Sequence, residues 1–97
     1  MTGKQRAFLR GLANSITVKY QIGKNGIDNN TISMIDEALE ANELIKIRVL
    51  ENSMLGVREA CETVCRKASA FPVQCIGNIF VIYRESINNK KISISEK

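Results

Sequence analysis

The amino-acid sequence predicts a single small α/β domain in which three helices pack mainly on one face of a four-stranded mixed sheet. Apolar residues recur at helical spacing in three segments, and they alternate with polar residues or form short β-rich runs in four others. These segments follow the order αβαβαββ, and the first strand, second helix and second strand are typical of a βαβ crossover. A chain of 97 residues, 44% of them hydrophobic, fits one domain, 1–97, with one modest core.

The first helix and the first strand are predicted in the N-terminal quarter. The helix covers about 3–16, because its apolar residues share one face and Thr2 and Gln5 have the spacing of a capping box. The strand covers about 17–22, where apolar and polar side chains alternate, and it ends at Gly23.

A helix, a strand and another helix are predicted in the middle of the chain. Asp28 is a suitable N-cap for the second helix, whose apolar pattern ends near Asn42. The second strand covers about 44–50, and the alternation in it sends both of its basic side chains to one face. The third helix covers about 54–68, with its cysteines and valines on the inward side.

A β-hairpin is predicted near the C-terminus. Two apolar runs, about 72–76 and 79–84, flank Gly77 and Asn78, which is the signal of a two-residue hairpin turn. The tail over about 86–97 is polar and basic, and it either extends the last strand or frays.

The charges are segregated along the chain. The net charge is +4, and residues 1–26 contain five basic residues and no acidic one, whereas residues 27–43 contain only acidic charges. A segregated basic surface is typical of proteins that bind a phosphate backbone. The alternative is an ordinary solvated surface, since scattered surface charges can give a similar net charge. No segment has the length of a membrane span or the pattern of a signal peptide, so we expect a cytoplasmic protein without membrane contact.

The residue types leave little room for catalysis or metal binding. The chain has no histidine and only three cysteines, of which Cys61 and Cys65 are spaced for a helix and Cys75 lies in a predicted strand. Zinc sites usually need four Cys or His ligands, and histidine is the commonest general base. We therefore expect no enzymatic activity, no cofactor and no metal site, and cysteines that pack as small buried apolar residues.

The segment QIGKNGID holds two glycines three residues apart, between a predicted strand and a predicted helix. One interpretation is a plain turn, since such glycine pairs are common in turns. The other is a phosphate-binding loop. The first N–H groups of a helix and the positive end of its dipole favour an anion, glycines allow close approach, and Lys24 adds a charge. The basic α/β context favours the second interpretation.

Several motifs together resemble the CRM domain family (chloroplast RNA splicing and ribosome maturation), specifically its bacterial stand-alone YhbY-like members. They are TGKQRAFLRGLA, QIGKNGI, IDEALEANELIKIRV and CIGNIFVIYRES, followed by KKISI, and they span nearly the whole chain. The resemblance implies an αβαβαββ fold similar to the C-terminal domain of translation initiation factor three, with a KH-like GxxG loop. It also implies RNA binding and association with precursors of the large ribosomal subunit.

The candidate RNA-binding residues come from this resemblance and from the basic segment. The family's loop, basic helix, second-strand lysine and fourth-strand arginine fall on matching positions here, and Lys19 joins them as part of the basic surround. The set is Gly23, Lys24, Asn25, Gly26, Lys4, Arg6, Arg10, Lys19, Lys46 and Arg84. We expect a monomer that binds ribosomal RNA in a pre-ribosomal particle.

Two features complicate this prediction. Family members often have a proline before the first strand and Thr-Glu after the loop, whereas this chain has Thr17-Val18 and Asp28. A carboxylate at Asp28 would compete with phosphate for the helix N-terminus. The acidic second helix also allows another function, a protein-interaction module that docks a basic ribosomal protein, although such charge runs are usually solvated helix faces.

Overall fold

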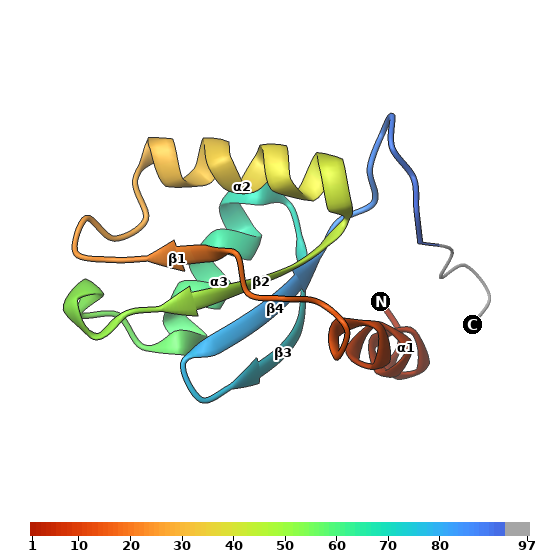
Figure 1. The fold of residues 1–97 in the computed structure, drawn as a ribbon, viewed down its shortest axis with the longest axis horizontal. Helices are drawn as coiled ribbons and strands as arrows, with labels where there is room; N and C mark the ends of the chain where they lie inside the picture. The colour runs from red at the N-terminus through yellow and green to blue at the C-terminus, as the bar shows by residue number, and fades with distance from the viewer. Residues whose placement is uncertain (93–97) are drawn as a thin grey trace.

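The computed structural model describes residues 1–92 and has the predicted order of helices and strands (Figure 1). The long elements are α1 (Gly3–Ala13), β1 (Tyr20–Ile22), α2 (Asn29–Asn42), β2 (Leu44–Val49), α3 (Val57–Ala68), β3 (Phe71–Ile76) and β4 (Ile79–Tyr83). A short 3₁₀ helix, η1 (Glu51–Ser53), lies between β2 and α3. The predicted α/β fold class is confirmed. None of the helices in the described part of the chain is long and apolar enough to cross a membrane.

The four strands form one mixed sheet in the order β1-β2-β4-β3. β1 and β2 are parallel and joined through α2, as expected for a βαβ crossover, while β4 is antiparallel to both of its neighbours. The predicted hairpin is confirmed, because Gly77 and Asn78 connect β3 to β4. Gly77 has φ +59, a left-handed conformation that this tight turn requires and that glycine adopts without strain.

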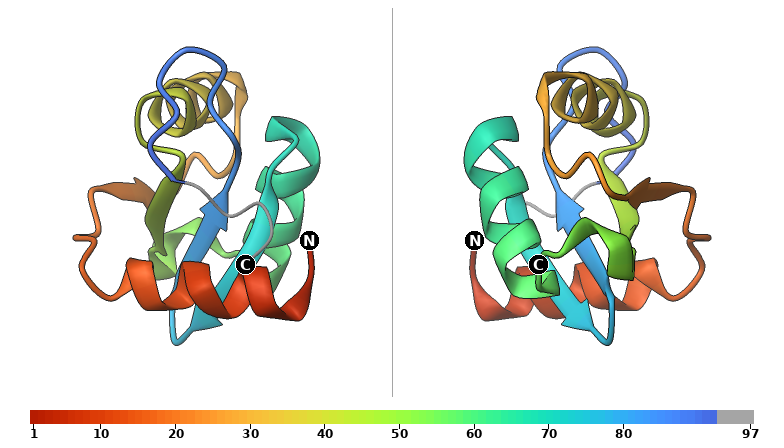
Figure 2. Two further views of the ribbon diagram at one scale, coloured as in Figure 1. Left: turned by 90° about the vertical axis from the view of Figure 1, so that its right-hand side faces the viewer. Right: turned by 90° about the vertical axis from the view of Figure 1, so that its left-hand side faces the viewer.

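The sheet has an apolar core on each face. α2 and α3 cover one face, where Ile35, Val64 and Phe80 are fully buried. α1 covers part of the opposite face through Leu9 and Ala13, which pack with buried residues of β2, β3 and β4 (Figure 2). Two of the three helices therefore share a face, and α1 lies alone on the other.

The structure corrects three predicted boundaries. α1 ends at Ala13, because Asn14, Ser15 and Ile16 donate to carbonyls three residues back and tighten the chain into turns. β1 begins only at Tyr20, since its register with β2 starts at the pair Tyr20 and Ile47, and the preceding segment leaves the sheet. α3 begins at Val57 rather than near 54, after Met54 in a left-handed conformation.

Residues 86–92 do not fray but fold back onto the end of α2 (Figure 1). The buried Glu43 carboxylate accepts N–H bonds from Ser86, Lys91 and Ile92 at 2.7–2.8 Å. Burial raises the pKa of Glu43, but these hydrogen bonds and the nearby Lys90 outweigh burial, so its pKa lies below the ordinary value. The prediction for residues 93–97 falls outside the described part of the chain.

Candidate nucleic-acid interface

The loop between β1 and α2 forms a tight turn at one end of the long axis (Figure 1). The Gly26 N–H donates to the Gly23 carbonyl at 2.9 Å, which leaves Lys24 and Asn25 exposed at the tip. Gly26 has φ +67, so a side chain there would be strained. A Cβ on Gly23 would lie 3.7 Å from Leu50 and Asn52 side-chain atoms, an ordinary contact, so Gly23 can accept a side chain.

Asp28 caps the helix that follows the loop. Its carboxylate accepts from the Thr31 backbone N–H at 2.8 Å and from the Thr31 hydroxyl at 2.9 Å. These two hydrogen bonds hold the pKa of Asp28 below its ordinary value, so the group carries a negative charge at neutral pH. The N-cap prediction is confirmed, and the carboxylate lies where a phosphate would otherwise meet the first turn of α2.

The basic residues of α1 do not surround the loop. α1 lies at the opposite end of the molecule from the loop (Figure 1). Lys4 and Arg10 are exposed, whereas the Arg6 Nε donates to the Pro72 carbonyl at 3.3 Å and ties α1 to β3. The structure therefore separates two groups that the sequence placed in one continuous basic segment.

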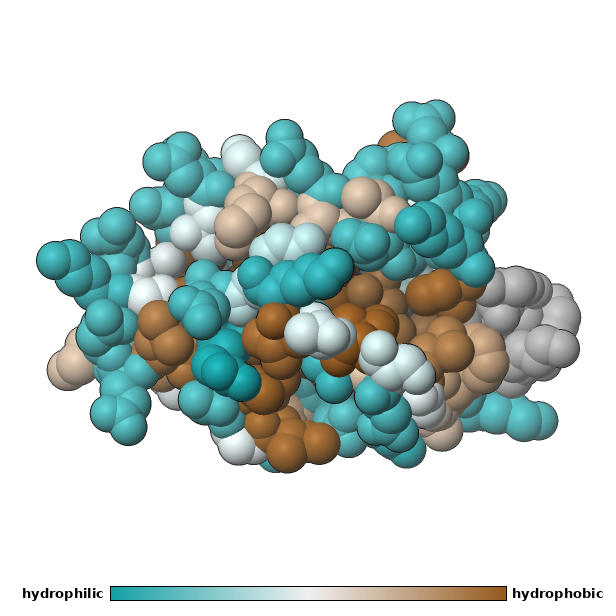
Figure 3. All heavy atoms as spheres, viewed as in Figure 1, coloured by the Kyte–Doolittle hydropathy of each residue, from teal (hydrophilic) through white to brown (hydrophobic). Residues whose placement is uncertain are grey.

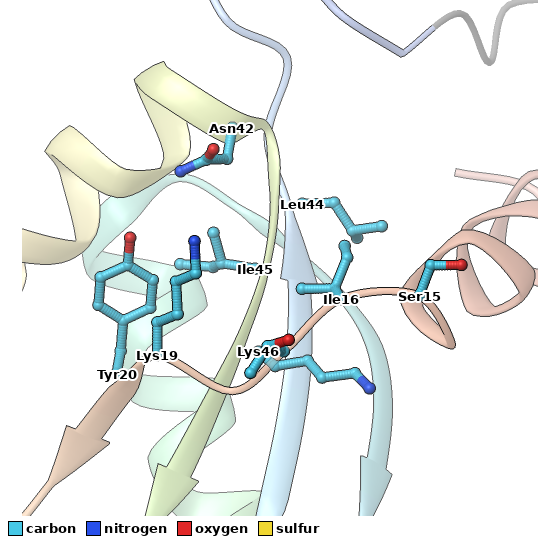
Figure 4. A pocket seen from close by; sticks show the side chains of 9 residues that line it. Ser15, Ile16, Lys19, Tyr20, Asn42, Leu44, Ile45 and Lys46 are labelled. Carbon is cyan, nitrogen blue, oxygen red and sulfur yellow. The ribbon is translucent and has the colours of Figure 1, made fainter.

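Basic side chains of the sheet region lie between these two ends. Lys46 leaves β2 on the face that α1 covers, and Lys19 lies in the segment before β1; both line a pocket of about 350 Å³ (Figure 4). Arg48 leaves β2 on the same face as Lys46, nearer the loop, in register with Gln21. Its Nε is buried and has no hydrogen-bond partner among residues 1–92.

Arg48 is a candidate residue that the sequence prediction omitted. The alternation in the second strand already indicated that its side chain shares a face with Lys46. We call the whole set the basic track. It consists of Lys4, Arg6, Arg10, Lys19, Lys46, Arg48 and Lys24, from α1 to the loop.

No residue of the basic track forms an ion pair within the described part of the chain. Residues 1–92 contain two ion pairs, Arg84 with Asp36 at 2.8 Å and Lys90 with Glu85 at 3.1 Å. Neither includes a residue of the basic track. Hydrophilic residues also cover most of the end of the molecule where the loop lies, with some apolar residues exposed among them (Figure 3). Unpaired cations on an exposed surface attract a polyanion at long range.

Arg84, also predicted to contact RNA, is bound inside the protein. Its Nη1 donates to the Asp36 carboxylate and to the Ala68 carbonyl, both at 2.8 Å, and its Nη2 donates to the Asp36 carbonyl at 3.1 Å. The guanidinium thus joins the end of β4 to α2 and to the last turn of α3. These contacts indicate a structural role, so we leave Arg84 out of the basic track.

The acidic residues of the second helix are largely engaged too. Asp36 pairs with Arg84, and the Glu40 carboxylate accepts bonds from Ser86, Ile87 and Asn88 of the tail. These tail contacts hold the pKa of Glu40 below its ordinary value. The helix therefore offers fewer free carboxylates to a basic protein partner than its sequence suggested.

The structure brings the three cysteines together. Cys61 and Cys65 of α3 are buried, Cys75 of β3 is half-buried, and all three pack in the same core cluster. The neighbouring Cys65 thiol, together with burial, raises the pKa of Cys61. Burial, together with neighbouring Cys61, raises the pKa of Cys75. Within residues 1–92, no group of histidine, cysteine or acidic side chains is arranged to hold a metal ion.

Known proteins share both the sequence and the fold. The Bacillus subtilis protein named YqeI, a probable RNA-binding protein, is 44% identical over 94 residues, which cover 97% of this chain and 98% of the relative. A Haemophilus influenzae RNA-binding protein is 33% identical over 97 residues, covering 100% of this chain and 97% of the relative.

A solved structure extends this similarity to the fold. The solution structure of a hypothetical Staphylococcus aureus protein, described as an RNA-binding candidate, matches with a TM-score of 0.79 and 47% identity. The match covers 96% of this chain and 97% of the other. The family model of the CRS1 / YhbY (CRM) domain matches residues 1–84. The chain therefore belongs to the CRS1 / YhbY (CRM) domain family.

Proposed function

We propose that this protein binds RNA through the Gly23–Gly26 loop and the basic track. The observation that carries the proposal is that none of the lysines and arginines of the basic track has an ion-pair partner in residues 1–92. RNA binding to such a surface is favourable because lysines and arginines displace the counterions that are condensed on the phosphates. The names of the Bacillus and Haemophilus relatives agree with this proposal.

The contacts are made mainly to the RNA backbone. Lys24 at the loop tip meets a phosphate as a mobile point charge, and Asn25 donates a hydrogen bond beside it. Phe80 and Tyr83 are buried, so they offer no stacking platform of the kind that reads a series of bases. Shape and charge therefore dominate recognition over most of the interface.

The RNA that we propose as the partner is ribosomal RNA in a precursor of the large subunit, bound in the cytoplasm by the monomer. This finer proposal rests on the resemblance to the YhbY-like members of the family. Crosslinking in cells, followed by sequencing of the bound RNA, tests it. Reads concentrated on large-subunit precursor RNA support the proposal, and reads spread over messenger RNA contradict it.

The loop is tested by a matched pair of substitutions at Gly23, where a side chain fits. Gly23→Asp adds a negative charge, and Gly23→Asn adds nearly the same shape without the charge. In filter binding to precursor RNA, we expect Gly23→Asp to weaken binding more than Gly23→Asn does. We expect Lys24→Ala to reduce the slope of log affinity against log salt by about one. Equal affinities for the Gly23 pair, with an unchanged slope for Lys24→Ala, would show that the loop does not meet phosphate.

A further inference from the structure

We propose that the pocket between the start of β1, β2 and the end of α2 binds one unpaired base of the RNA. This inference rests on the proposed function and deepens it, because it adds a base site to a backbone interface. The pocket has a volume of about 350 Å³, within the range of small-ligand sites. It lies at the opposite end of β1 from the loop.

The pocket exists because β1 is short. β1 pairs with β2 only from Tyr20 and Ile47 onward, so the stretch Leu44–Lys46 extends past the start of β1. Segment 14–19 leaves the sheet here and runs to α1, so the pocket opens between this segment and β2 (Figure 4). The sheet gives this stretch of β2 no β1 neighbour, and its free edge borders the pocket.

The lining matches the two surfaces of a nucleobase. The half-buried Ile16 supplies apolar area for the face of the ring, and Leu44 and Ile45, each only 2% exposed, form the apolar floor. The Tyr20 hydroxyl and the Asn42 amide supply hydrogen-bonding groups for its edge, and Tyr20 points toward Asn42 (Figure 4). Asn42 already donates Nδ2 to the Ala38 carbonyl at 3.1 Å, which orients the amide and leaves Oδ1 as an acceptor.

The charges around the pocket match a nucleotide within a chain. Among residues 1–92, no acidic residue lines it, and neither Lys19 nor Lys46 has an ion-pair partner. Their amino groups point to different sides of the pocket, Lys19 toward α2 and Lys46 toward α1 (Figure 4). A nucleotide inside an RNA strand has a phosphate on each side, so the two lysines can meet both.

The position of the pocket also connects it to the rest of the interface. The three residues of β1 span about 10 Å, so one short RNA segment can reach both the pocket and the loop. Single-stranded RNA presents such splayed bases, whereas a duplex keeps its bases stacked. The pocket therefore adds a preference for unpaired RNA to an interface that otherwise reads the backbone.

NMR titration of the full ¹⁵N-labelled chain tests this site. The probes are adenosine and uridine 5′-monophosphates, ribose 5-phosphate, which has no base, and a single-stranded RNA of ten nucleotides. We expect the nucleotides to shift amide signals of residues 15–20 and 42–46, and ribose 5-phosphate to leave them in place. Equal shifts with ribose 5-phosphate would reduce the pocket to an anion site and overturn the proposal.

Substitutions give an independent readout. Tyr20→Phe with Asn42→Ala removes the two edge-binding groups and keeps the ring packing and the helix. We expect affinity for the single-stranded RNA to fall about tenfold, as two lost hydrogen bonds would cause, with duplex binding unchanged. Lys67→Gln, an exposed change on α3, is the control that leaves both affinities unchanged.

The outcomes separate this inference from the proposed function. Loop signals that shift with RNA while pocket signals stay in place would overturn the base site and leave RNA binding intact. A double variant that binds both RNAs like the wild type would do the same. If neither loop nor pocket responds to RNA, the proposed function and this inference both fail.

Discussion

Glu43→Gln tests whether one buried carboxylate holds the C-terminal segment on the domain. Glu43 follows α2, has φ +68, and is 0% exposed. Its Oε1 accepts the N–H groups of Lys91 and Ile92 at 2.7 Å, and its Oε2 accepts that of Ser86 at 2.8 Å. Glutamine has the same size but only one acceptor oxygen, so at least one N–H group would face an NH₂ group.

The expected cost follows from these contacts. A hydrogen bond to a charged acceptor contributes about 1.5–3 kcal/mol, and a neutral one about half as much. Losing one bond and weakening the others should lower the free energy of unfolding by about 2–4 kcal/mol. For a domain of this size, that change lowers Tm by roughly 10–20 °C. The backbone strain at φ +68 is the same in both proteins, so it does not enter the difference.

Urea unfolding at pH 7 and at pH 3 is the assay. The pKa of Glu43 in the folded protein lies below its ordinary value of 4.5. The ionised carboxylate therefore stabilises the fold fully above pH 4.5, and this stabilisation is lost as the pH falls through the folded-state pKa. The difference in free energy of unfolding between wild type and Glu43→Gln should therefore reach its full value at pH 7 and be smaller at pH 3. Glu37→Gln, an exposed change on the same helix, is the control and should change stability by less than about 0.5 kcal/mol.

Two results would refute this reasoning. If Glu43→Gln unfolds within about 0.5 kcal/mol of the wild type at pH 7, the three hydrogen bonds do not hold the segment. If the deficit is large but the same at pH 3, the ionised carboxylate is not its source.

Two further predictions concern residues beside the proposed interface. Arg84→Met removes the hydrogen bonds to Asp36 and Ala68, so thermal unfolding should show a free energy of unfolding lower by about 1–3 kcal/mol. RNA affinity, measured at a temperature where the variant is folded, should stay unchanged. A loss of affinity without a loss of stability would show that Arg84 contacts RNA. Asp28→Asn keeps an N-cap residue and removes the negative charge near the loop. RNA affinity in filter binding should therefore rise about two- to threefold, with little change in Tm. Lower affinity would contradict competition between the Asp28 carboxylate and phosphate.

Most of the fold could be predicted from the sequence, because its signals are local. Apolar periodicity, the Asp28 cap and the Gly77-Asn78 turn each act within a few residues, and each appears in the structure. The boundaries around Ala13 and Tyr20 could not be predicted, since they depend on where β1 meets β2. The pocket at that junction could not be predicted from the sequence for the same reason.

The sequence by itself determined the αβαβαββ order, the basic first quarter and a glycine-flanked loop before a helix, because these properties belong to neighbouring residues. Only the tertiary structure decided how the charges are used. It paired Arg84 with Asp36, 48 positions away in the chain, and bound Glu40 and Glu43 to the tail. It also moved α1 away from the loop and left Arg48 and Lys46 between them. Charge compensation depends on distance in space, and that distance is set only when the chain folds.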